Sequence, residues 1–171
     1  YTARIIACDA KWRPANINEM EYLDQYNEFH IDDYSFSMAT KVPYTHYRLA
    51  VPRVTLPCNY LLVVYRNYDE KDLVLSRRFL VFDQKVILKS NVALAGGVDE
   101  RRENHQIDFT VDYSNIDVPN PLLDLTVVLQ QNQRWDNAIF GLQPSMIRED
   151  ISQLVYRHVN FENNFKAGNE F

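Results

Sequence analysis

The chain has 171 residues and a mass of 20.2 kDa, which is enough for one ordinary domain or two small ones. Its formal net charge is -5 and it contains no long basic block, which argues against a nucleic-acid or anionic-membrane surface. It also contains no apolar run of about 18 residues, which excludes a transmembrane helix.

Alternating apolar and polar residues predict strands through the first half of the chain. In NYLLVVYR (59–66) the odd-numbered and the even-numbered positions are both apolar, so both faces of a strand here would be apolar. This predicts a central strand covered on both faces. NINEMEYLDQY (16–26) is the one helical candidate, because Ile17 and Met20 could share a face, and an irregular segment remains the alternative. The other predicted strands are ARIIACD (3–9), YSFSMAT (34–40), THYRLAV (45–51) and LVLSRRFLVFD (73–83).

The second half shows the same alternation, with two long runs separated by a turn. Ile107, Phe109, Val111 and Tyr113 define one predicted buried face, and Leu123, Leu125, Val127 and Leu129 define another. NIDVPNP lies between the two runs and is typical of a turn, so we expect 107–113 and 123–129 to be neighbouring strands. Further strands are predicted at 86–94, 152–157 and 158–161.

Many short strands with turn clusters between them are typical of β-sandwich modules. The aromatic content of 13%, with eleven Tyr and nine Phe against four Gly, favours the same all-β class. FDQK (82–85) marks a seam, so we predict two consecutive immunoglobulin-like or fibronectin-like β-sandwiches, 1–83 and 84–171. The chain opens on Tyr1 without an initiator Met, and we expect it to be a piece of a longer protein whose upstream strands would complete the first module.

No catalytic pattern is present in the sequence. The G-x-S-x-G elbow, the P-loop and the GxGxxG fingerprint are all absent, and no carboxylate pair is placed across a cleft by its spacing. His30, Asp32 and Asp33 could begin a metal site, but a polar loop before a strand is the favoured interpretation. We therefore predict no enzymatic activity, no metal and no cofactor.

Two cysteines and several aromatic residues leave alternatives open. Cys8 and Cys58 have no metal-ligand spacing and are either small core residues or a disulfide pair. Trp12, Trp135, Tyr44 and Tyr47 lie near strand ends, where aromatic rings either pack at the edge of a sandwich or stack on a sugar. Packing is the favoured interpretation.

Seven segments form an ordered set that covers nearly the whole chain. They are CDAKWRP (8–14), EYLDQY (21–26), YTHYRLAVP (44–52), NYLLVVY (59–65), RRFLVFD (77–83), QNQRWDNA (131–138) and AGNEF (167–171). In order and spacing they resemble the N-terminal region of the type IX (type 9) secretion system plug proteins of Bacteroidota. The chain departs from the family pattern at Ala7, where the family commonly has His, and at Gln25, Cys58 and Gln133, where it tends to have Gly.

The resemblance implies a periplasmic protein associated with the outer membrane and exported by a signal peptide outside these residues. Plug proteins close the periplasmic mouth of a large outer-membrane β-barrel translocon. The implied partner is therefore that barrel, and the implied function is occlusion by protein–protein contact, without catalysis, cofactor or small-molecule substrate.

The polar segment LQQNQRWDNAI (129–139) follows the run at 123–129 and is interpreted as a structural corner. The candidate structural or contact residues of the chain are Trp12, Asn132, Arg134, Trp135 and Asp136. We expect Trp135 to cap the core and Arg134 to pair with Asp136 or with nearby backbone.

Two other functions compete with the plug hypothesis. A carbohydrate-binding β-sandwich of a surface glycan system would use the Trp and Tyr side chains as stacking platforms. A structural spacer domain of a larger enzyme would have its active site outside these residues.

Overall fold

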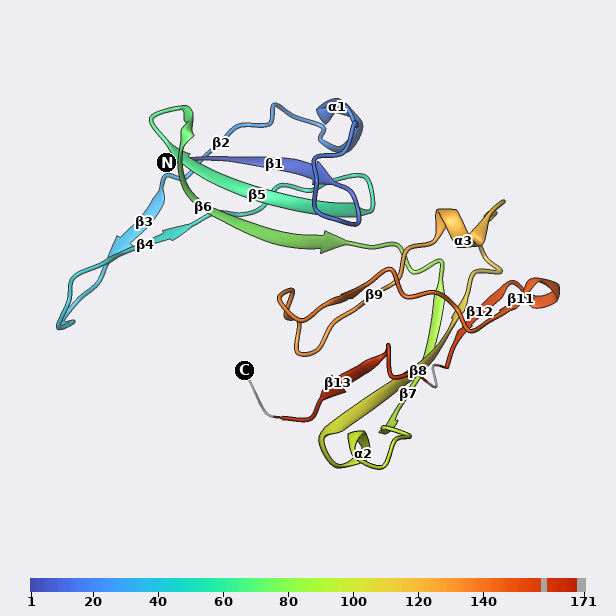
Figure 1. Ribbon diagram of the computed structural model, residues 1–171. Helices are drawn as coiled ribbons and strands as arrows, with labels where there is room; N and C mark the ends of the chain where they lie inside the picture. Colours follow the sequence, from blue (N-terminus) through green and yellow to red (C-terminus); the bar gives the residue numbers. More distant parts are fainter. Residues whose placement is uncertain (158–159, 169–171) are drawn as a thin grey trace. The chain divides into compact units, whose positions relative to one another are not determined.

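Antiparallel strands make up most of the regular secondary structure in the computed structural model, which describes residues 1–157 and 160–168 (Figure 1). The helices are single turns, so the all-β prediction is confirmed. Contacts divide the chain into two units, Tyr1–Asp83 and Gln84–Phe171, and the interpretation of each as an immunoglobulin-like module stays a prediction. None of the described helices has the length and apolar character needed to cross a lipid bilayer.

The first unit combines a four-stranded sheet with a separate hairpin. The sheet has the order β2-β1-β5-β6, and β3 pairs only with β4 among the described residues. The elements are β1 (Thr2–Cys8), α1 (Glu19–Tyr22), β2 (Phe29–His30), β3 (Asp33–Phe36), β4 (Thr45–Arg48), β5 (Cys58–Arg66) and β6 (Asp69–Val81).

The alternation along β1 decides which face of this sheet is buried. Ala3, Ile5 and Ala7 point to the buried face, and the register places them opposite Val64, Leu62 and Tyr60 of β5 in the same order. Tyr22 and Leu23, at the end of α1, pack on this face.

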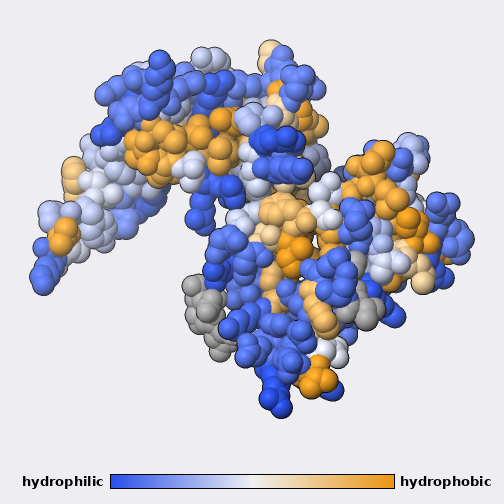
Figure 2. All heavy atoms as spheres, viewed as in Figure 1, coloured by the Kyte–Doolittle hydropathy of each residue, from blue (hydrophilic) through white to orange (hydrophobic). Residues whose placement is uncertain are grey.

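The other face of β5 is less covered than the sequence predicts. The central position of 59–66 is confirmed, but Leu61 and Val63 stay partly exposed and lie outside the buried clusters of the described residues. Figure 2 shows apolar residues gathered over the sheet of this unit. The predicted cover on this face of β5 is therefore met only in part: Tyr65 is 4% exposed, whereas no layer buries Leu61 and Val63.

Helix α1 is much shorter than the predicted segment 16–26. Asn18 caps it through an Oδ1 that accepts a hydrogen bond from the Met20 backbone N–H at 3.1 Å, and the Glu21 carboxylate accepts one from the Asn18 N–H at 2.9 Å. This capping box fixes where the helix begins. The helix ends after one turn, because Leu23 is extended and enters the core.

The second unit is built around β8, which pairs with β7 on one side and with β12 and β13 on the other. A separate two-stranded sheet consists of β9 and β10. The elements are β7 (Ile87–Leu94), α2 (Glu100–Glu103), β8 (Asn104–Asp112), α3 (Pro121–Asp124), β9 (Val128–Leu129), β10 (Ile139–Phe140), β11 (Met146–Arg148), the 3-10 turn η1 (Glu149–Ile151), β12 (Gln153–Tyr156) and β13 (Asn164–Lys166).

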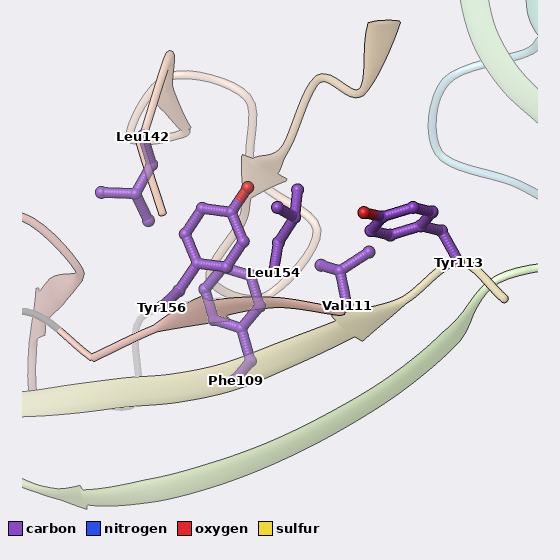
Figure 3. Packing of buried hydrophobic residues seen from close by; sticks show 6 residues of the cluster. All are labelled: Phe109, Val111, Tyr113, Leu142, Leu154 and Tyr156. Atoms are coloured by element: carbon purple, nitrogen blue, oxygen red, sulfur yellow. The ribbon is translucent and has the colours of Figure 1, made fainter. Parts of the chain in front are cut away.

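The core of the second unit lies on one face of the β8–β12 pair (Figure 3). Phe109 of β8 and Tyr156 of β12 are register partners, and their rings stack with centroids 4.4 Å apart. Val111 and Leu154 are the next pair on the same face. The predicted buried face of 107–113 is thus confirmed at Phe109, Val111 and Tyr113.

The predicted strand 123–129 is wrong over most of its length. Pro121–Asp124 forms the helical turn α3, in which the Asn120 N–H donates to the Asp124 carboxylate at 3.0 Å. This turn breaks the alternation, so Leu123 is 78% exposed and only Val128–Leu129 forms a strand. The predicted pairing of this segment with 107–113 is also wrong, because β7, β12 and β13 occupy both edges of β8.

The end of the chain also differs from the prediction. The strand expected at 152–157 is present as β12, whereas the strand expected at 158–161 includes residues 158–159, which lie outside the described residues. Strand β13 was not predicted.

Candidate protein-contact surfaces

The outer edge of β1 is closed by the segment that follows it. The buried Asn27 side chain accepts a hydrogen bond from the Ile5 N–H at 2.9 Å and donates one to the Ile5 C=O at 2.7 Å. The Tyr22 hydroxyl donates to the same carbonyl, and the Ala15 N–H donates to the Ala7 C=O. An unpaired strand edge is a template for association with another chain, and these contacts remove that template from β1.

The hairpin of β3 and β4 carries a group of exposed apolar side chains in the first unit. We call residues 33–48 the aromatic arm. Figure 1 shows that it extends away from the four-stranded sheet. Its exposed apolar side chains are Tyr34, Phe36, Met38, Val42, Tyr44 and Tyr47.

Local contacts hold the aromatic arm in one conformation. Ser37 and Tyr44 close its tip, because the Ser37 N–H donates to the Tyr44 C=O and the Tyr44 N–H donates to the Ser37 hydroxyl, both at 2.9 Å. The Tyr34 ring packs against Phe36 and Tyr47 at centroid distances of 5.6 and 6.0 Å. A preformed apolar surface of this kind is typical of a protein-contact site.

Trp12 lies in the turn that follows β1. Its φ is 63°, and the Arg78 guanidinium lies 5.0 Å above its ring, within range of a cation–π contact. Asp9 organises the turn, since its carboxylate accepts hydrogen bonds from the backbone N–H groups of Lys11 and Arg13. The backbone N–H and guanidinium of Arg13 are the main cause that holds the pKa of Asp9 below its usual value.

The segment LQQNQRWDNAI forms the loop of the β9–β10 hairpin. Asn132 and Gln133 have φ values of 53° and 59°, a backbone conformation that glycine adopts without strain. Gln133 is one of the departures from the resembled pattern named in the sequence analysis, and its positive φ is one that Gly in its place would adopt without strain. The Gln131 amide donates to the Lys166 carbonyl at 2.9 Å and so ties the loop to β13.

The structure contains an ion pair within this loop. The Arg134 Nη2 lies 2.5 Å from a carboxylate oxygen of Asp136, and this hydrogen bond is the main cause that lowers the pKa of Asp136. Trp135, between them, is half-buried and stacks on Phe140 at 6.4 Å. The four candidate residues of the loop, Asn132, Arg134, Trp135 and Asp136, belong to the second unit, whereas Trp12 belongs to the first.

We expect Trp135→Ala to lower the free energy of unfolding by about 1–2 kcal/mol, because the ring loses its contact with Phe140 but was only half-buried. Urea denaturation measures this change, and Trp135→Phe should recover most of it. An unchanged unfolding free energy together with loss of partner binding would show that Trp135 is a contact residue.

Metal and disulfide chemistry find no support in the described residues. Across 1–157 and 160–168, no three His, Cys, Asp or Glu side chains are grouped closely enough to hold a metal ion. Cys8 and Cys58 are both free thiols, and burial raises the pKa of Cys8. Cys8 is opposite Asn59 in the sheet and Cys58 is opposite Val81, so alternation directs the two side chains to opposite faces.

Comparison with known families decides the identity of the first unit. Residues 1–83 match the family model described as "Type 9 secretion system plug protein 1st domain". The first unit belongs to this plug family. The resemblance found in the sequence is thereby confirmed, and the match indicates a role related to type 9 secretion for the first unit. The plug family itself is a non-catalytic component of secretion.

A solved structure extends the similarity beyond the plug first domain. The chain is 27% identical to a hypothetical protein from Parabacteroides merdae, with a TM-score of 0.88. The match covers 99% of this chain and 43% of that one, so the chain spans less than half the length of its structural relative. This likeness supports the β-sandwich-like fold class. No curated protein matches the chain.

The sequence did not single out the aromatic arm as a site. The strands were predicted at 34–40 and 45–51, and Tyr44 and Tyr47 were weighed as platforms, but nothing pointed to Phe36 or Met38. The available signal was the alternation of large apolar residues in two adjacent short strands joined by a polar turn.

Proposed function

We propose that this protein is a non-catalytic periplasmic component that contacts the outer-membrane translocon barrel of the type 9 secretion system and keeps the idle pore shut. The match of residues 1–83 to the plug first-domain family carries this proposal. A closed pore needs a partner that binds at its periplasmic mouth by protein–protein contact, and such contact requires an exposed, preorganised surface.

The aromatic arm is the surface of the first unit that best fits this contact. It presents Phe36, Met38, Val42 and Tyr44 to solvent at its outer end, and Tyr34 and Tyr47 lie nearer its base. Burying these side chains against a partner removes apolar area from water, which drives association. Aromatic and Met side chains are also enriched in the buried centres of protein interfaces.

Affinity purification of the tagged protein from outer membranes tests the partner. We expect the translocon barrel to be recovered with it from resting cells. Deletion of the protein should increase the entry of large hydrophilic antibiotics, because an unplugged barrel conducts them. Recovery of no barrel from either resting or secreting cells would refute the proposal.

A double change, Phe36→Ser with Met38→Ser, tests the arm itself. We expect roughly tenfold less barrel to be recovered, because the centre of the contact loses its apolar side chains. The melting temperature should change little, because both residues are exposed and only the contact of Phe36 with the Tyr34 ring is lost. Met20→Ser is the matched control, since Met20 is 87% exposed and Met38 is 88% exposed in the same unit. Equal recovery with both variants would exclude the arm as the contact.

A carbohydrate-binding module is the alternative function, and the exposed Tyr34, Tyr44 and Tyr47 rings of the aromatic arm favour it. Such rings can stack on sugar faces. A glycan array distinguishes the two functions: binding that disappears with Tyr44→Ala would support the lectin, and no binding across the array would favour the plug.

A further inference from the structure

Strand β7 of the second unit has one open edge. Among the described residues β8 is its only strand partner, and the register with β8 runs without a shift from Ile87 to Leu94. The usual devices that protect an edge are bulges, prolines and several charged side chains. β7 has no bulge and no proline, and Lys89 is its one charged residue. By contrast β6, the edge strand of the first unit, contains register shifts.

The backbone groups that face the open edge follow from the hydrogen bonds of β8. The Ile107 N–H donates to the Asn163 carbonyl and the Tyr113 N–H donates to the Ser152 carbonyl, so odd-numbered residues of β8 bond away from β7. The even-numbered residues of β8 therefore bond to β7, and the register pairs them with odd-numbered residues of that strand. The N–H and C=O groups of Leu88, Ser90 and Val92 consequently point to the open edge.

The side chains of the same three residues lie on the core face of the sheet. Leu88 is opposite Val111, Ser90 is opposite Phe109 and Val92 is opposite Ile107. Figure 3 shows Phe109 and Val111 rising from β8 on the side where Leu154 and Tyr156 lie. Leu88 and Val92 are nevertheless 68% and 61% exposed, so the apolar face of the sheet continues beyond its covered part.

We propose that the open edge of β7 pairs with β7 of a second copy of this chain, antiparallel and with a two-fold axis at Ser90. Two-fold antiparallel pairing joins residues on the same face, and an axis at Ser90 places Leu88 opposite Val92, Lys89 opposite Asn91 and Ile87 opposite Ala93. Each apolar side chain meets an apolar side chain, and Ser90 meets its own copy. Leu88, Ser90 and Val92, whose backbone N–H and C=O groups point to the open edge, then form the hydrogen-bonded pairs between the two copies.

The charges of the sheet fit the same register. Lys89 meets Asn91 rather than the Lys89 of the other copy. Asn91 is itself opposite Asp108 of β8. Across the joined sheet, Lys89 of one copy therefore faces Asn91 of the other copy, and Asp108 of that other copy lies one strand further on. The Cα atoms of Lys89 and this Asp108 are separated by two strand spacings of about 4.8 Å each. The long Lys side chain can extend across most of this distance. The pairing thus sets opposite charges near each other across the two-fold axis.

This inference is independent of the proposed plug function. It is tested on the intact protein by sedimentation velocity at increasing concentration. We expect a concentration-dependent dimer, and Val92→Lys should weaken it roughly a hundredfold, because a charged side chain would replace an apolar one in the joined face. Leu123→Lys, which changes an exposed residue outside β7, should leave it unchanged. A protein that stays monomeric, or a dimer insensitive to Val92→Lys, would overturn the proposal.

Crosslinking tests the position of the two-fold axis. Ser90→Cys should form an intermolecular disulfide on mild oxidation, because the two Cα atoms of this pair would lie about 5.5 Å apart. Asn91→Cys should not, because its two copies would be more than about 7 Å apart. The unchanged chain under the same oxidation accounts for Cys8 and Cys58. Equal crosslinking of the two variants, or capture of a different protein by Ser90→Cys in place of a second copy, would contradict this pairing.

Discussion

Leu154→Ala is expected to lower the free energy of unfolding of the second unit by about 3–4 kcal/mol. Leu154 is 1% exposed and lies opposite Val111 in the middle of the core. Truncation removes its transfer free energy and leaves a cavity between the Phe109–Tyr156 stack and Tyr113, where packed rings cannot collapse. Hydrogen exchange of β8 and β12 amides in increasing urea measures the change.

Leu123→Ala is the matched control for this prediction. Both changes remove the same atoms from the same unit, but Leu123 is 78% exposed on α3. Its effect should stay within about 0.5 kcal/mol. Similar losses from the two variants would mean that 123–129 packs as the alternation predicts and not as the structure has it.

Asn27→Leu is expected to lower the free energy of unfolding of the first unit by about 2–3 kcal/mol. The leucine has a similar volume but removes the amide that accepts from the Ile5 N–H, which leaves that buried donor without a partner. The Ile5 carbonyl keeps its bond from the Tyr22 hydroxyl, and this limits the loss. Urea denaturation followed by hydrogen exchange at β1 measures it.

Asn16→Leu makes the same chemical change at an exposed residue of the same segment and should be nearly neutral. A loss of equal size in both variants would place the effect in the unfolded chain. Unchanged protection of the Ile5 amide in Asn27→Leu would show that Asn27 does not close the edge of β1.

The sequence predicts strands well where the alternating apolar residues are also the ones that other parts of the chain bury. The run at 107–113 was predicted correctly because its alternate residues are the ones that β12 and the loops above it cover. The run at 123–129 has the same alternation and was wrong, because Asn120 and Pro121 start a helical turn whose local hydrogen bonds outweigh the periodic signal. Local capping therefore decided the structure there.

Alternation also says nothing about whether a covering layer exists. The segments 34–40 and 45–51 have the pattern of strands with one buried face, but in the structure that face is the exposed aromatic arm. Likewise β7 was predicted as an ordinary strand, and its open edge follows only from the order of strands in the sheet. Both candidate contact surfaces exist because no neighbouring strand or layer covers them. A single sequence does not show whether such a neighbour is present.

The placement of the two cysteines on opposite faces of one sheet has a consequence for where the protein can fold. Because Cys8 and Cys58 point away from each other, the first unit reaches its structure without an oxidant or a disulfide isomerase. Its stability is then set by packing and hydrogen bonds that are the same on both sides of an inner membrane. The fold of the first unit thus needs no disulfide, so recombinant material made in a reducing cytosol is suitable for the experiments above.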